Sequence, residues 1–130
     1  MKTYNESRGA TVVLSSTQLQ NLQSAPIILI PAQGTGKIII PLQVFYSYTY
    51  GTVQYTDTVI LSPDNSGQPL NFNNSINMTD AVSNAGYLGS PEYYSALLPN
   101  SPMCILANGS MGNGDGTLTI VMFWVAQGGF

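Results

Sequence analysis

The chain has few side chains that could do chemistry. Its 130 residues include no histidine, one cysteine and six acidic residues, and the acidic residues are scattered. Acyl transfer, proton abstraction and most metal chemistry need a histidine, a reactive cysteine or carboxylates that converge on one point. Cys104 lies in the apolar run Met103–Leu106, which favours a buried side chain over a reactive thiol. One cysteine without histidine also cannot complete a zinc site or form an internal disulfide.

The acidic residues do not indicate a hydrolase. A carbohydrate hydrolase needs two carboxylates that face each other across the substrate. The pairs available are Asp57 with Asp64 and Asp80 with Glu92, and no spacing in the sequence supports either pair. We therefore expect no enzyme activity, no catalytic residues and no cofactor.

Two glycine-rich segments are similar to ligand-binding loops, but the residues around them do not fit. Gly34-Thr35-Gly36-Lys37 matches the end of a phosphate-binding loop, yet the motif needs glycine where Pro31 stands and serine or threonine where Ile38 stands. Asp115, in Asn113-Gly114-Asp115-Gly116, is one carboxylate where a calcium site needs six or more oxygen ligands. We expect no metal, and we interpret these glycines as a tight turn with positive φ.

Composition points to a surface that other proteins cover. Only 7% of the residues are charged, against roughly 25% in a typical globular protein, and the net charge is −3. Such a surface lacks the charge repulsion that keeps monomers apart, although an ordinary monomer of low charge is the alternative. The three basic residues are not clustered, which excludes nucleic acid as a partner. No run reaches the ~18–20 apolar residues of a membrane span, and no signal-peptide core is present, so we expect a protein made in the cytoplasm.

The elements that would position partner contacts are strands. From Gly36 to Gly51 every even position is apolar or aromatic, and the odd positions are mixed and mostly polar. This period of two predicts one long strand with its even side chains in a core, and a bend or bulge near Pro41. A hairpin at Gly51-Thr52 is expected to lead into a strand over 53–61.

Further strands are expected over 10–15, 27–30, 102–106 and 117–126. Ser15 and Gln18 resemble a capping box, which predicts a short helical turn near residues 16–23. With about eight strands, the fold predicted is an all-β, antiparallel β-sandwich of jelly-roll type. We expect a flexible N-terminal arm over 1–9 and a single β-sandwich domain over 10–130.

Two features suggest where partners bind. Residues 68–100 lack a regular pattern, and such a long irregular stretch is often a contact loop. Tyr87, Tyr93 and Tyr94 in it are our expected partner contacts, although they could equally cover the end of the domain. The strand over 117–126 is apolar on both faces in its second half, which is typical of a central strand or of a subunit interface.

Both ends of the sequence resemble small structural proteins encoded among the head genes of tailed phages. The matching segments are Leu14–Leu22, Pro26-Ile27, Pro31–Lys37, and Gly112–Ile120 with the aromatic strand around Trp124. The resemblance covers about the first fifty and the last twenty residues, and the family has no catalytic motif to carry over. It implies a virion protein: a capsid decoration (cement) subunit or a head-fibre component, often a homotrimer.

We therefore expect a capsid decoration subunit that binds the major capsid protein and stabilises the phage head shell. It would be a homo-oligomer, a trimer by the resemblance, located on the capsid surface of the virion. The alternative is a head-fibre or receptor-binding domain that contacts a host surface glycan or protein through residues 68–100.

Overall fold

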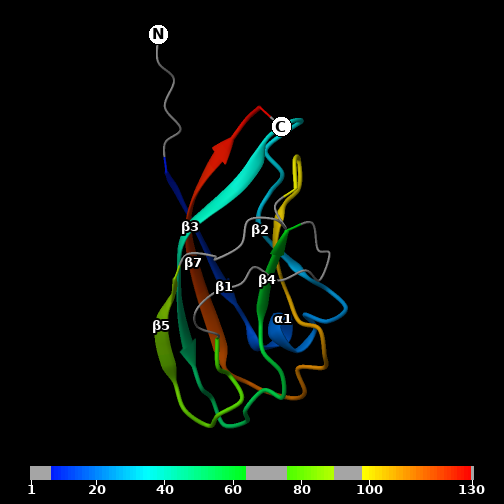
Figure 1. Cartoon of the computed structure of the whole chain (residues 1–130). Helices are drawn as coiled ribbons and strands as arrows, with labels where there is room; N and C mark the ends of the chain where they lie inside the picture. The colour runs from blue at the N-terminus through cyan, green and yellow to red at the C-terminus, as the bar shows by residue number, and fades with distance from the viewer. Residues whose placement is uncertain (1–6, 64–75, 90–97, 130) are drawn as a thin grey trace.

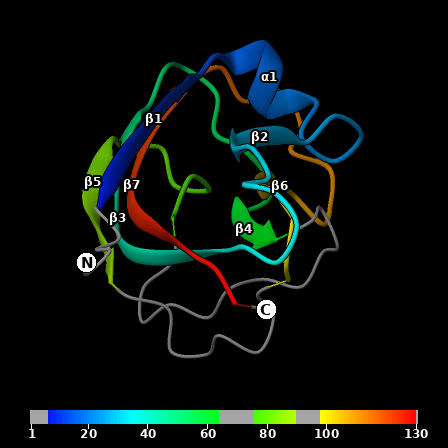
Figure 2. The same cartoon turned by 90° about the horizontal axis from the view of Figure 1, so that it is seen from above.

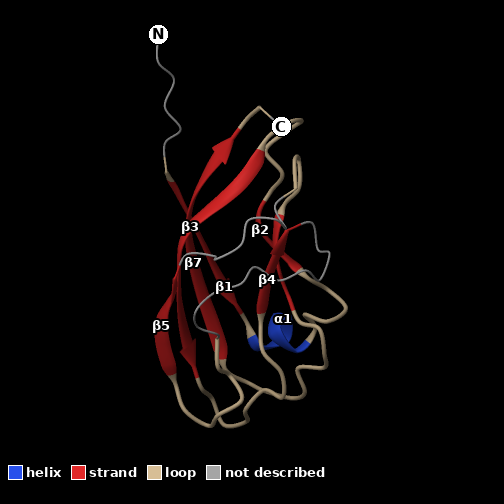
Figure 3. Ribbon diagram, in the orientation of Figure 1, coloured by secondary structure: helices blue, strands red, loops and turns tan. Residues whose placement is uncertain are grey.

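Two antiparallel sheets pack face to face in the computed structural model, which describes residues 7–63, 76–89 and 98–129 (Figure 1). The larger sheet has the strand order β1 (Arg8–Leu14), β7 (Thr117–Gln127), β3 (Ile38–Thr49) and β5 (Asn84–Gly89). The smaller sheet has the order β2 (Ile27–Ile30), β6 (Met103–Leu106) and β4 (Ile60–Pro63). The predicted all-β sandwich is confirmed, with seven strands in the described part of the chain (Figure 3).

Strand β3 contains the bulge that the sequence predicts. Its register against β7 shifts between Pro41 and Gln43, which leaves Leu42 as an extra residue. An extra residue reverses the inward and outward alternation of a strand. The prediction that all even positions face the core is therefore right from Val44 to Tyr48. Before the bulge the odd residue Ile39 is buried as well as the even residue Ile38, and Leu42 is 36% exposed, so the prediction is wrong at Leu42.

The short helix forms where the capping box predicts it. Helix α1 spans Ser16–Gln20, and Ser15 is its N-cap. The Ser15 hydroxyl accepts a hydrogen bond from the Gln18 N–H, and the Gln18 side chain accepts one from the Ser15 N–H. Leu19 in the helix and Leu22 just after it are fully buried, so this segment covers the core beside β1 and β2 (Figure 2).

The predicted hairpin after β3 does not form. Residues 50–58 cross to the other side of the sandwich, and β4 pairs with β6 instead of β3. The partners of β3 are β7 and β5, and β5 lies within the range 68–100 that was expected to be irregular. Tyr55, in this crossing segment, is 1% exposed and packs in the core although it lies outside any strand.

Strand β7 is central in the larger sheet and supplies much of the core. Its even residues Leu118, Ile120, Met122 and Trp124 are at most 5% exposed. Cys104 is buried on β6, as its apolar neighbours predict. Strand β1 begins at Arg8, inside the range 1–9 that was expected to be an arm. Among the described residues, no helix is long and apolar enough to cross a membrane.

Candidate interaction surface

The outer face of the four-stranded sheet is an uncharged surface that no other described strand covers. The ladder registers place its side chains in three cross-strand rows over β5, β3, β7 and β1. The rows are Ala85-Ser47-Thr119-Val13, Tyr87-Phe45-Val121-Thr11 and Gln43-Phe123-Gly9. None of these residues is charged. We call this set the outer sheet face.

Three aromatic rings form the centre of the outer sheet face. The rings of Phe45 and Tyr87 lie 5.0 Å apart between centroids, and those of Phe45 and Phe123 lie 6.2 Å apart, edge to face. Phe45 is 40% exposed, Tyr87 42% and Phe123 39%. Contiguous exposed apolar surface on a soluble protein commonly marks an interaction site, and aromatic residues are enriched at the centre of interfaces.

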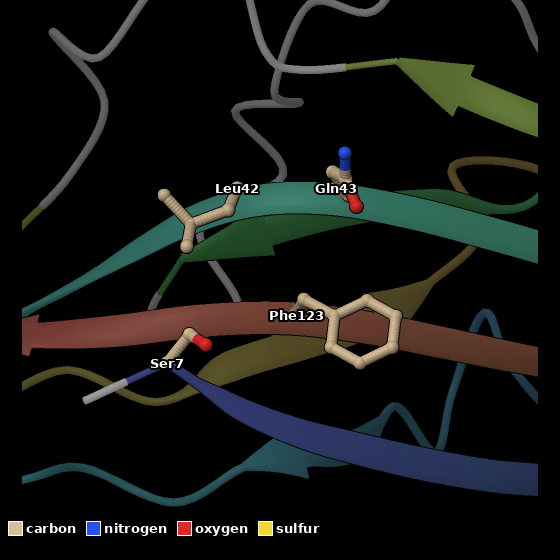
Figure 4. A pocket seen from close by; sticks show the side chains of 4 residues that line it. All are labelled: Ser7, Leu42, Gln43 and Phe123. Carbon is tan, nitrogen blue, oxygen red and sulfur yellow. The ribbon is translucent and has the colours of Figure 1, made fainter.

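A shallow groove extends this face at the bulge. Leu42 and Gln43 of β3 line one side, with Phe123 of β7 and Ser7 just before β1 on the other (Figure 4). Leu42 reaches this surface because it is the extra residue of the bulge. The groove therefore depends on the same irregularity that reverses the faces of β3.

The cation at the start of β1, Arg8, is oriented to the opposite face of the sheet. Arg8 pairs with Trp124 across the β1–β7 ladder, and its guanidinium lies 5.3 Å from the centre of the Trp124 ring. Trp124 is a core residue, so Arg8 shares the inner side of the sheet. This cation–π contact leaves the outer sheet face neutral.

The structure places one of the three expected contact tyrosines on this surface. Tyr87 lies on β5 beside Phe45, on a regular strand instead of a loop. Tyr93 and Tyr94 lie outside the described residues. The sequence did not single out Phe45 and Phe123 as partner contacts. Both are odd-numbered residues of predicted strands whose even-numbered residues were expected in the core, so an aromatic residue at an outward position could have indicated them.

At the opposite end of the sandwich, Asp115 joins two loops. One of its carboxylate oxygens accepts hydrogen bonds from the N–H groups of Thr52 and Val53 at 2.7 and 2.8 Å, and the other accepts one from the Thr52 hydroxyl. The Asp115 N–H donates to the Val53 carbonyl at 3.1 Å. The Thr52 hydroxyl first, and then the two N–H groups, lower the pKa of Asp115. Asp115 is thus a structural clasp between the loops.

The expectation of positive φ at the glycines on either side of Asp115 is wrong. Positive φ occurs at Gly112, whereas Gly114 and Gly116 do not have it. A Cβ at Gly114 would overlap the Tyr55 ring, and one at Gly116 would overlap the Thr49 carbonyl. These positions need glycine because the ring and the backbone approach them closely.

The ring beneath this clasp is a core anchor. The Tyr55 hydroxyl donates a hydrogen bond to the Gly116 carbonyl at 2.6 Å, and its ring meets that of Tyr48 edge to face at 6.1 Å. Burial raises the pKa of Tyr55 to about 12. The clasp and the tyrosine together hold residues 50–55 against the loop before β7.

The two described carboxylates of the expected acidic pairs bond to residues close to them in the sequence. Asp57 accepts a hydrogen bond from the Thr58 N–H, and Asp80 accepts one from the Asn77 amide, so both carboxylates bond locally. Asp64 and Glu92 lie outside the described residues. Residues 7–63, 76–89 and 98–129 contain no group of three or more His, Cys, Asp or Glu side chains that could hold a metal ion.

The fold and surface define a two-sheet antiparallel β-sandwich with an uncharged aromatic face. Among solved structures, the chain is similar to the cyanophage Pam1 capsid asymmetric unit, with a TM-score of 0.51 and 12% sequence identity. The match covers 93% of this chain and 84% of that chain. At this identity the likeness establishes the fold alone. No protein-family model and no curated protein matches the chain.

Proposed function

We propose that this protein is a structural component of a tailed-phage capsid, a decoration (cement) subunit that binds the major capsid protein through the outer sheet face. The observation that carries the proposal is the neutral aromatic surface around Phe45, Tyr87 and Phe123. The likeness of the fold to a chain from a cyanophage capsid and the resemblance of both ends of the sequence to phage head proteins support it. The proposed role is structural, without catalysis.

The size of the outer sheet face suits repeated docking. Four strands ~4.8 Å apart and rows spanning ~20 Å give a face of roughly 400 Å². A stable interface between two proteins buries about 800 Å² on each partner. One copy would therefore bind weakly, and a subunit linked to other copies would gain affinity because its contacts act together on a regular shell. We propose a homo-oligomer for this reason, and the resemblance to phage head proteins implies three copies.

Binding to assembled shells tests this function. Shells formed by the major capsid protein of the same genome are mixed with the purified protein, and the bound copies and the temperature of shell opening are measured. We expect saturation at a fixed number of copies and opening at a higher temperature. Phe123→Asp should lower the affinity about tenfold or more, because it places a charge in the desolvated centre of the contact.

Ile28→Asp is the matched control, because Ile28 is 60% exposed on β2 of the other sheet. It should bind shells like the unmodified protein. Failure to bind shells would refute the function, and equal loss from both variants would refute the outer sheet face as the docking surface. Adsorption of the free protein to host cells in place of shells would favour the receptor-binding alternative.

A further inference from the structure

Three of the four sheet edges carry features that prevent another strand from adding to them. Strand β2 lies between Pro26 and Pro31 and contains a register shift, and β4 contains Pro63. Strand β5 has a register shift against β3 and contains Gly89, whose φ is +91°. Short length, proline, bulges and glycine kinks are the devices by which natural proteins protect exposed edges.

Strand β1 has none of these features. It pairs with β7 in an unbroken register from Arg8 to Leu14. It contains no proline, and its only charge is on its first residue. Within the described residues, β1 has no ladder on its other side. Val13, near its end, is 63% exposed, the largest value among the large hydrophobic side chains of the described chain.

We propose that β1 pairs with β1 of a second copy of this chain, antiparallel and around a two-fold axis at Thr11. This register joins two four-stranded sheets into one continuous sheet. It places Gly9 opposite the partner's Val13, Ala10 opposite the partner's Val12, and Thr11 opposite the partner's Thr11. The proposal concerns the free backbone edge of β1, whose residues Gly9, Thr11 and Val13 form the margin of the outer sheet face. It does not depend on binding to a capsid.

The side chains of β1 complement themselves in this register. Thr11 faces the partner's Thr11, which is one of the cross-strand pairs that stabilise antiparallel sheets, and no like charges stand directly opposite each other. Gly9 matters most, because a Cβ there would stand 3.4 Å from the Phe123 ring, so the missing side chain leaves that ring edge open. The partner's Val13 would cover it.

The charges on β1 and the area that two paired strands would bury both allow a second copy of the chain at this edge. The two Arg8 side chains lie at opposite ends of the paired strands, ~20 Å apart, so they do not repel each other at contact distance. A strand of seven residues is ~24 Å long and covers less area than a standard interface. The pair should therefore form reversibly and depend on concentration. A two-fold pair gives dimers, whereas the resemblance to phage head proteins implies trimers.

Cysteine cross-linking tests the register. Directly opposed residues of antiparallel strands have Cβ atoms about 4.5–5.5 Å apart, and a disulfide needs about 3.5–4.5 Å, so a small shift of the two edge strands closes the bond. Thr11→Cys should therefore form a covalent dimer under mild oxidation. Thr119→Cys is the matched control on β7, one strand inward, where the two cysteines would be ~14 Å apart or more and should not bond. Cys104 is buried and can remain.

Sedimentation equilibrium tests whether copies of the chain associate through the β1 edge. Val13→Lys should weaken association about tenfold or more, because each pair contains the substitution twice and lysine is a residue that blocks strand addition. Ser47→Lys, which adds the same charge on the inner strand β3, should leave association unchanged. A monomer at every concentration, a trimer, equal cross-linking of both cysteine variants or equal loss from both lysine variants would each overturn the proposal.

These outcomes separate the two proposals. Tyr87→Asp, on β5 at the far edge of the sheet, should lose binding to shells and still allow the Thr11→Cys dimer to form. A cross-linked dimer that does not bind shells would refute the capsid function and support the strand pairing. Shell binding by a strict monomer would support the capsid function and refute both the strand pairing and the proposed homo-oligomer.

Discussion

At the scale of single residues, the structure depends most visibly on Asp115. Its side chain and its backbone together make four hydrogen bonds to Thr52 and Val53, which lie more than sixty residues earlier in the sequence. The sequence around Asp115 suggested a turn and excluded a calcium site, but it did not reveal this clasp. The partner of an exposed carboxylate is decided by which loop the fold brings beside it.

The clasp predicts a change in stability with pH. Because hydrogen bonds lower the pKa of Asp115 below 3.8, its contribution is complete above the ordinary pKa and is lost as the pH falls through the lowered value. Thermal unfolding followed from pH 7 to pH 2 should show part of the acid loss disappearing in Asp115→Asn. Asp80→Asn is the control, because the bond of Asp80 within the described residues is to Asn77 in its own loop. An unchanged acid profile in Asp115→Asn would contradict the clasp.

At the scale of elements, one extra residue determines which side chains partners can contact. Without Leu42, every second residue along the whole of β3 would point outward, with no change at the bulge. With it, Ile39 and Val44 both face inward, and Phe45 joins Tyr87 and Phe123 outside. Pro41 indicated a bulge in the sequence, but its exact position, and so the identity of the exposed residues, required the pairing with β7.

The capping box of α1 gives a prediction for one element. Ser15→Ala removes the side chain that accepts from the Gln18 N–H, and the loss of such a cap costs about 0.5–2 kcal/mol of unfolding free energy. Thr17→Ala, on an exposed position inside the helix, should cost nothing, because alanine is the better helix former. Urea unfolding measures both, and equal midpoints for the two variants would show that the cap does not stabilise the fold.

At the scale of the whole molecule, neighbouring residues of β7 have different roles: one stabilises the core and the next is exposed for binding. Met122 is fully buried and Phe123 is 39% exposed on the opposite face. Met122→Ala should cost about 2–5 kcal/mol by leaving a cavity in the core. Phe123→Ala should cost clearly less and reduce binding to shells. Urea unfolding with a shell-binding assay checks both, and comparable losses of stability would mean that Phe123 belongs to the core.

The sequence by itself determined the class of fold, because period-two alternation, turn residues and a capping box are local signals that need no distant partner. It also determined that the surface is nearly uncharged. The tertiary structure alone decided which strands pair, which outward rings meet and which edge is open. The predicted hairpin was wrong for that reason: Gly51-Thr52 allows a turn, but Tyr55 packs in the core and the next strand, β4, joins the other sheet. Long-range packing overrides local turn preference wherever a large side chain gains a place in the core.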